Sequence, residues 1–230
     1  KMSVINSNSA AMLTANSINK NERMMTSTME RLSTGKRINS AADDPAGLAI
    51  ATRLTSQVNG LNQAARNANN AISMVQIADN AADTLDNIFQ RMREIVVQAA
   101  DGSNSASDIA LLNTEFTALA EETDRLVDTT SYNGRNIING NADESGGSSV
   151  TYQVGSNAGI EQTLTIDFGD LNLGNGGLGG DFSSWKTTGL GSNLNTTLTD
   201  IDTAISAVAT QRATYGASLN RLEYAVDNLH

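Results

Sequence analysis

Two rows of apolar residues at seven-residue spacing run through the C-terminal segment. One row is Leu198, Ile205, Leu219 and Val226, with Arg212 in its single polar position, and the other is Ile201, Val208, Tyr215, Leu222 and Leu229. Residues seven apart lie on the same side of a helix, so the two rows predict one long helix whose apolar side needs partner helices. The chain is thereby constrained to a helical bundle, with partners from elsewhere in the chain or from other copies of it.

The N-terminal segment carries a weaker row of the same kind. The positions between its members are mostly Ser, Asn and Thr, which are mediocre helix formers. We therefore expect this segment to gain structure against a partner helix rather than alone. The row, which we interpret as an assembly surface, consists of Val4, Ala11, Ile18, Met25 and Leu32.

Capping signals predict a very long helix between these two segments. Gly35 ends the first segment, and Asp44 can cap a helix whose first turn begins at Pro45. No other proline occurs, and a helix continuing to about Ala100 would be roughly 80 Å long. Its expected apolar row is Leu54, Leu61, Ala68, Val75, Ala82, Phe89 and Val96, joined early by Val58, Ala65 and Ile72.

The break at Asp101, Gly102 and Ser103 predicts a helical hairpin. We expect Ser107 to start a second helix that lies antiparallel on the first. Its apolar face is Ile109, Leu112, Phe116, Leu119 and Leu126.

Turn signals and alternating residues then predict a small antiparallel β unit. Asn133-Gly134 and Asn139-Gly140 are turn sequences. Two segments alternate between apolar and polar residues with the period of a half-buried strand, and their apolar members are Val150, Tyr152 and Val154, and Leu164, Ile166 and Phe168. We expect residues 169–195, rich in Gly, Asn and Ser, to form a surface excursion, with Trp185 and Phe182 as a local aromatic staple rather than a ligand platform.

Composition and charge exclude several classes of function. The net charge is −10, and the positive excess is confined to residues 1–40, where basic and acidic residues are mixed, so we expect a solvated helix face and no nucleic-acid partner. There is no cysteine, and no apolar run is long enough to insert into a membrane. The N-terminus also lacks a signal-peptide core, so any export would use a route without a cleaved Sec-type signal. Aromatic residues are only 4% of the chain, which favours a narrow aliphatic bundle over a globule with a deep pocket.

Motifs of catalysis and cofactor binding lack the context they need. Residues 174–179 have the glycine spacing of a dinucleotide loop but no following helix, and residues 167–169 spell a kinase magnesium motif without its partners. Asn139, Asn141 and Asp143 are spaced like calcium ligands, but position twelve of that loop is Val150. The sole histidine is His230. We therefore predict no enzyme, no cofactor and no dedicated metal site, and we interpret Met24, Met25 and Met29 as interface packing rather than metal ligands.

Several long motifs resemble bacterial flagellins. They cover, in order, about residues 3–140 and 197–229, and their length makes a chance match untenable. The clearest are residues 30–51 (ERLSTGKRINSAADDPAGLAIA), 65–69 (ARNAN), 90–98 (QRMREIVVQ), 132–134 (YNG) and 215–222 (YGASLNRL).

The resemblance implies a mainly α fold: an elongated antiparallel helical rod, coiled-coil-like, with a small antiparallel β-hairpin unit at its distal end. Residues 1–43 would be the N-terminal inner-tube arm, and residues 44–140 with 195–230 the rod. Residues 141–194 would hold the β-hairpin unit and a short variable outer region. Members of the family continue beyond the position of Leu229 into a helix that pairs with the arm. We accordingly expect a C-terminally truncated chain, monomeric and unable to form filaments, whose ends at Lys1 and His230 look like cloning remnants.

The resemblance also implies function and partners. The expected function is that of a secreted structural subunit of the flagellar filament, whose partners are other flagellin subunits and the flagellar export apparatus with its chaperones. The host flagellin-sensing Toll-like receptor is a further expected partner. Its contacts would map, by position in the family motif, to Gln90, Arg91, Arg93, Glu94, Ile95 and Glu115.

Two alternative readings stay open at this point. A flagellin homologue displayed on the cell surface could bind an extracellular ligand such as a polysaccharide. The negative charge disfavours an acidic glycan unless a local patch such as Lys36-Arg37 or a bridging cation is used. A junction or cap protein of the flagellum is a nearer alternative, disfavoured by the motif at residues 90–98.

Overall fold

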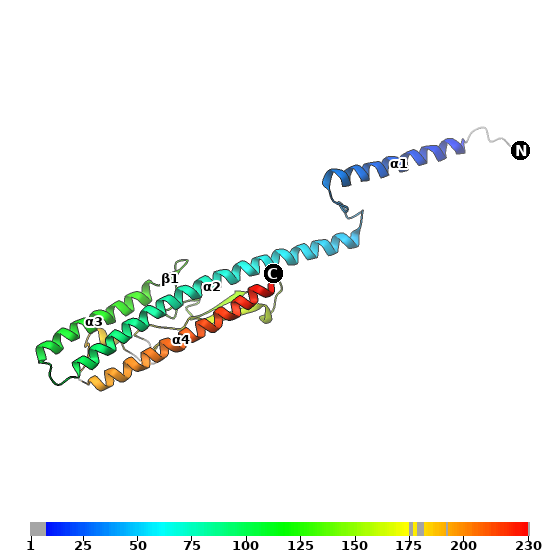
Figure 1. Cartoon of the computed structure of the whole chain (residues 1–230). Helices are drawn as coiled ribbons and strands as arrows, with labels where there is room; N and C mark the ends of the chain where they lie inside the picture. The colour runs from blue at the N-terminus through cyan, green and yellow to red at the C-terminus, as the bar shows by residue number, and fades with distance from the viewer. Residues whose placement is uncertain (1–7, 175–176, 179–181, 192, 230) are drawn as a thin grey trace. The chain divides into compact units, whose positions relative to one another are not determined.

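The structure is a computed structural model that describes residues 8–174, 177–178, 182–191 and 193–229 (Figure 1). The helices are α1 (Ser9–Thr34), α2 (Pro45–Ala99), α3 (Ala106–Thr129) and α4 (Leu194–Leu229). The strands are β1 (Ser131–Tyr132), β2 (Arg135–Asn136), β3 (Ser149–Gln153) and β4 (Thr163–Asp167), and the short 3₁₀ helices are η1 (Ile160–Gln162) and η2 (Ser183–Lys186). The fold is mainly α with a small antiparallel β unit, as the sequence predicts.

The chain forms two compact units that divide between Val58 and Asn59, inside α2. The first unit contains α1 and the beginning of α2. Helix α1 is capped by Asn8, whose Oδ1 accepts from Ala11 N at 3.1 Å, and ends at Gly35 in the left-handed conformation. The predicted start of α2 at Pro45 is confirmed, and Asp44 Oδ1 accepts from Gly47 N at 2.9 Å. The assignment of residues 1–43 to an inner-tube arm stays a prediction.

The second unit is an antiparallel bundle. Helices α3 and α4 both run opposite to α2, and the β strands accompany them (Figure 1). The first apolar row of α2 is buried from Ala68 to Val96, as predicted. The predicted companion row is not the buried one: Val58 is exposed, and Ala65 and Ile72 are half-buried. The buried row runs one position earlier in the sequence. The side of α2 that its neighbours cover carries instead Ala64, Ala71, Ala78, Leu85, Met92 and Ala99.

Helix α4 buries one of its two predicted rows as far as Leu222, and the last member, Leu229, is half-buried. Ile201, Val208, Tyr215 and Leu222 have no exposed surface, while the row containing Leu198 and Val226 is half-buried at the edge. The polar position in that second row is filled by Arg212, which pairs with Asp79 at 3.2 Å and with Asp83 at 2.8 Å on α2. The predicted need for partner helices is therefore met inside the chain.

Helix α3 begins earlier than predicted. Ser105 is its N-cap instead of Ser107, because Ser105 and Asp108 form a reciprocal capping box. Asp108 N donates to Ser105 Oγ at 3.2 Å, and Ser105 N donates to Asp108 Oδ2 at 3.0 Å. On the predicted apolar face Phe116 is fully buried, and the other members are half-buried.

The predicted strands and turns are present. Strands β3 and β4 pair antiparallel, with Val150 opposite Ile166 and Tyr152 opposite Leu164. Strands β1 and β2 form a hairpin whose turn residues Asn133 and Gly134 both have positive φ, 52° and 78°. A left-handed backbone is ordinary for Asn-Gly, which explains the turn signal in the sequence.

The segment after β4 is not the surface excursion that its composition predicts. Its apolar residues enter the core, and each is at most 5% exposed: Leu171, Leu173, Leu178, Phe182, Trp185 and Leu190. Trp185 does stack on Phe182 at 4.6 Å, but it also contacts Phe116 and Phe89 edge-on at 5.8 and 6.3 Å. The aromatic staple therefore joins this segment to α2 and α3 rather than closing a local loop.

Candidate assembly and receptor-contact surfaces

The predicted assembly row lies on a helix that buries none of its residues. Ile18, Met25 and Leu32 are 53%, 62% and 85% exposed, and Ala11 is also exposed. Val4 lies outside the described residues. Within its own unit, α1 therefore presents an uncovered apolar stripe at helical spacing, the pattern of a surface that packs against a partner helix.

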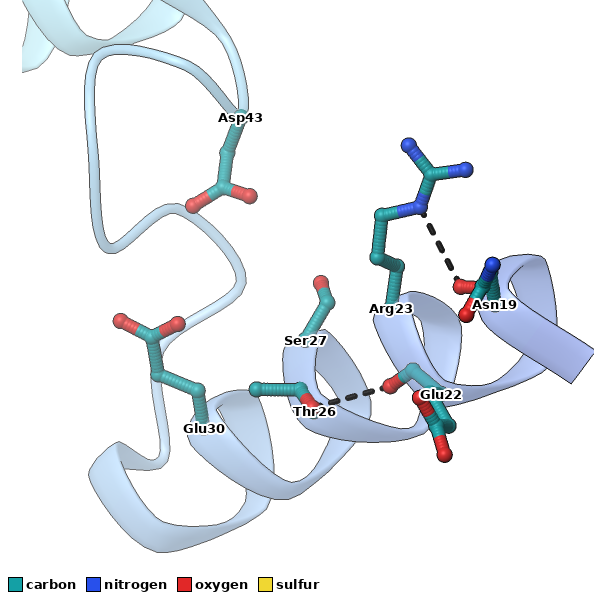
Figure 2. Close-up of a pocket in the computed structure, with 7 residues that line it drawn as sticks. All are labelled: Asn19, Glu22, Arg23, Thr26, Ser27, Glu30 and Asp43. Carbon is teal, nitrogen blue, oxygen red and sulfur yellow. Dashed lines mark hydrogen bonds between the residues drawn. The ribbon is translucent and has the colours of Figure 1, made fainter.

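A polar hollow of about 690 Å³ lies between α1 and the segment that follows it (Figure 2). It is lined by Asn19, Glu22, Arg23, Thr26, Ser27, Glu30 and Asp43. Arg23 donates to the carbonyl of Asn19, as the dashed line in Figure 2 shows, while Glu30 and Asp43 lie on opposite sides of the hollow. Carboxylates and a guanidinium mixed on an open surface are solvated, so this hollow has no built ligand site.

Asp43 in this hollow serves the chain's own backbone. Its Oδ2 accepts from Ser40 N at 3.0 Å and from Asn39 N at 3.1 Å, and these bonds lower the pKa of the carboxyl group below its ordinary value. Arg31 lies 3.8 Å away and lowers it further. The carboxylate thus stays ionised and holds the turn that leads into α2.

The predicted receptor-contact residues form a charged surface on α2 and α3. Arg91 donates to Glu115 Oε1 through Nε at 2.9 Å and through a terminal nitrogen at 2.7 Å, and to Glu94 Oε2 at 3.0 Å. These hydrogen bonds, the one to Glu115 most, raise the pKa of the Arg91 guanidinium. Arg91, Glu94 and Glu115 are about half-exposed or more, so the cluster is open to a partner.

Two residues further along α2, and about 160° around the helix axis from Arg91, Arg93 reaches α4. Its Nε donates to Asp202 Oδ1 at 2.8 Å, which raises the pKa of Arg93. Gln90 Nε2 donates to Asp86 Oδ2 at 2.7 Å. Sequence reasoning missed Asp202, which is 109 positions from Arg93. A shallow hollow of about 480 Å³ follows this face and is lined by Gln90, Arg93, Glu94, Val97 and Gln98.

Ile95 does not belong to this surface. Its side chain is fully buried, and it is part of the hydrophobic core of the bundle. Because α2 has 3.6 residues per turn, Ile95 faces the core on the same side as Met92 and Val96, while its neighbour Glu94 faces outward. Its place among the predicted contact residues was wrong, and it supports the surface from beneath.

The spacing motifs of the sequence do not assemble a metal centre among the described residues. No group of three His, Cys, Asp or Glu side chains there is arranged to hold a metal ion. Asn139 Oδ1 accepts from Asn141 N, and Asp143 Oδ1 accepts from Glu144 N, so these oxygens organise their own turns. Asn175, Gly176 and Gly179 of the glycine run, and His230, lie outside the described residues. In the described part of the chain, no helix combines the length and the apolarity needed to cross a membrane.

Comparison with known proteins agrees with the fold. A crystal structure of Bacillus cereus flagellin superposes with a TM-score of 0.56 at 30% identity, covering 71% of this chain and 88% of that one. A putative flagellar hook-associated protein from Vibrio parahaemolyticus superposes with a TM-score of 0.64 at 17% identity, covering 83% and 94%, and shows the fold alone. The bundle is thus of the class found in proteins of the bacterial flagellum.

Sequence comparison specifies the family. Residues 5–143 match the family model of the bacterial flagellin N-terminal helical region. A flagellin of Escherichia coli is 42% identical over 216 residues, covering 94% of this chain and 37% of that protein. A flagellin of Xenorhabdus nematophila is 45% identical over 170 residues, covering 74% and 52%. The chain belongs to the bacterial flagellin family, and it spans about a third to a half of the length of these two relatives.

Proposed function

We propose that the chain is the helical part of a structural subunit of the flagellar filament, which works by assembling with further flagellin subunits outside the cell. The observation that carries the proposal is the apolar row of α1, which is exposed along its described length. Covering one large aliphatic side chain contributes about 1.5 to 3 kcal/mol, so docking several of them on partner helices supplies a strong drive to associate. The bundle of the second unit has covered its own core and offers no comparable apolar stripe on α4.

The test of assembly compares the chain with a chimera that carries the C-terminal residues of the Escherichia coli relative after Leu229. Sedimentation and electron microscopy should find filaments of the chimera. Met25→Asp in the chimera should abolish them, because a charge then sits within the apolar row. Met24→Asp is the matched control, since Met24 is similarly exposed but lies beside the row. Filaments that form equally well with either substitution would refute a role for the row.

Export is a second part of this proposal. We propose that the subunit leaves the cell through the flagellar export apparatus with the help of its chaperones, as in the family that it belongs to. The chain should then appear in the medium of a strain with an intact apparatus and stay in the cells of a strain without one. Equal secretion by both strains would contradict this route.

We also propose that the charged surface around Arg91 is recognised by the host flagellin-sensing Toll-like receptor. The support is the exposed, hydrogen-bonded cluster of Arg91, Glu94 and Glu115, with Gln90 and Arg93 also exposed on the neighbouring surface of α2. Removing a charge from an interface weakens electrostatic attraction to the partner, and the loss is larger where binding buries the charge.

The receptor test is a reporter-cell assay with single arginine substitutions. Arg91→Ala should weaken activation at least several-fold. Arg125→Ala is the control, because Arg125 is likewise an exposed arginine paired with a glutamate, Glu122, on α3. Activation by Arg91→Ala at the level of the unmutated chain would refute the proposal.

A further inference from the structure

The methionines within the described residues, which leave out Met2, fall into two groups with opposite exposure. Of the seven, the four on α1 are Met12, Met24, Met25 and Met29, all between 55% and 66% exposed. Met74 and Met92 in α2 are at most 5% exposed. Met74 is protected further, because its sulfur accepts a hydrogen bond from the Tyr152 hydroxyl at 2.8 Å. Among the described residues, exposed thioethers are thus concentrated on α1, which finds no cover within its own unit.

Two of the exposed methionines lie on the side of α1 that carries the apolar row. Met25 is a member of it, and Met29 follows four residues later on the same side of the helix. Met12 and Met24 each sit one residue from a member of the row, so they point about 100° away around the helix axis. Met12 and Met24 therefore serve as controls for chemistry at Met25 and Met29, because all four are exposed on the same helix.

We propose that α1 is an oxidation-sensitive segment, in which hydrogen peroxide converts exposed thioethers to sulfoxides before assembly and thereby blocks docking of the row. The sulfur lone pair attacks one peroxide oxygen, the O–O bond breaks, and the sulfoxide and one water are formed. Sulfur loses two electrons and the peroxide gains them, so no further reactant is needed. The chain has no cysteine to compete for the oxidant.

The consequence follows from the polarity of the product. A sulfoxide is polar and accepts hydrogen bonds strongly, so burying it in an apolar seam without a partner is unfavourable. Oxidation at Met25 and Met29 places this group inside the row, whereas oxidation at Met12 and Met24 leaves it in water. Docked copies would in turn cover the two thioethers of the row and protect them. The inhibitory effect rests on the proposed assembly function, but the selectivity of oxidation does not.

Selectivity is tested on the chain as it exists. After limited treatment with hydrogen peroxide, peptide mass spectrometry should find sulfoxide forming about tenfold faster at the four α1 methionines than at Met74 and Met92. Circular dichroism should show an unchanged bundle over this period, which excludes unfolding as the cause. Equal rates at the exposed and buried methionines in the folded protein would overturn the inference.

Inhibition is tested on the C-terminal chimera with paired leucine substitutions. Peroxide should abolish filament formation by the unsubstituted chimera and by the Met12→Leu, Met24→Leu pair. The Met25→Leu, Met29→Leu pair should keep assembling after the same treatment. If treated and untreated unsubstituted protein assemble alike, the inference fails. If untreated protein does not assemble at all, the proposed function fails, and the mass-spectrometric result still decides the selectivity.

Discussion

Helices α1 and α4 both carry apolar residues at seven-residue spacing, and they bury them to opposite extents. Ile201, Val208, Tyr215 and Leu222 of the α4 row are fully buried, whereas Ile18 in the row of α1 is 53% exposed. The two helices are similar in local sequence, since each combines a spaced apolar row with polar residues, but they differ strongly in burial. An apolar row of this kind indicates that a helix needs a partner. Which surface covers the row is decided by the tertiary or quaternary structure.

The difference has a physical origin in what each helix contacts. Helix α4 lies along α2 and β4, and its single polar row position, Arg212, is matched by carboxylates on α2. Helix α1 is stabilised within its unit by its caps and by local hydrogen bonds such as that from Thr14 to the Ala10 carbonyl. Isolated helices held only by local bonds are marginal in water.

The largest test removes the same atoms from both rows. Ile201→Ala should lower the free energy of unfolding by about 2 to 5 kcal/mol, because it opens a cavity in a packed core. Ile18→Ala should change it by less than about 0.5 kcal/mol, because the side chain is already in water. Urea titrations followed by circular dichroism measure both values. Similar losses for the two variants would remove the contrast between the helices.

A second test concerns the buried hydroxyl of α4. Tyr215 donates to the Phe168 carbonyl at 2.6 Å, so Tyr215→Phe should lower the free energy of unfolding by about 1 to 3 kcal/mol by leaving a buried acceptor without its donor. Burial also raises the pKa of Tyr215, and it raises that of Tyr152 to about 12 from 10.0.

The raised tyrosine pKa values predict that the bundle loses stability at alkaline pH. A tyrosine whose pKa is higher in the folded state contributes stability that is fully present below pH 10 and is lost as the pH rises towards 12. Unfolding midpoints in urea should therefore fall across this window, and Tyr152→Phe should flatten the fall. Helix α1 has no tyrosine and should add nothing to the effect. A slope unchanged in Tyr152→Phe would show that other groups cause it.

Capping offers a smaller contrast between the helices. Ser105→Ala removes the capping box of α3 and should lower the free energy of unfolding of the bundle by about 1 kcal/mol. Asn8→Ala removes the cap of α1, and it should reduce the helical signal of that segment without shifting the unfolding midpoint of the bundle. Hydrogen exchange at the amides of each helix distinguishes the two. A shift of the bundle midpoint in Asn8→Ala would mean that α1 is coupled to it.

The smallest expected effect is at the polar position of α4. Arg212 and its partners are about one third or more exposed, so Arg212→Leu should change the free energy of unfolding by less than about 1 kcal/mol. The difference from the unmutated chain should shrink further at 1 M salt, as screening weakens exposed ion pairs. A loss that is large and independent of salt would show that Arg212 fixes the register of α4 against α2.

Local signals were enough to predict where elements begin, end and turn. Asp44 and Pro45 start α2, Gly35 ends α1, and Asn133-Gly134 makes a hairpin, because each acts through backbone geometry within a few residues. Helix α3 starts at Ala106, one residue before the predicted Ser107, because Ser105 has Asp108 at the spacing that a capping box requires.

Burial was predicted less well, because it depends on distant residues. The row of α2 from Ala68 to Val96 could be read from spacing, but the choice of its companion row depended on where neighbouring elements lie. For the charged surface, the family motif supplied the residues of α2. The pairing of Arg93 with Asp202 and the burial of Ile95 had no signal in the local sequence.

The sequence by itself determined the class of this protein, its long helices, its turns and its membership of the flagellin family, because caps, spacing and long motifs are written in contiguous residues. The tertiary structure alone decided that the glycine-rich segment around Trp185 belongs to the core and that the row of α4 is covered. It also decided that the row of α1 finds no cover in its own unit. Covering an apolar surface requires another surface of matching shape, and only the folded chain brings such surfaces together.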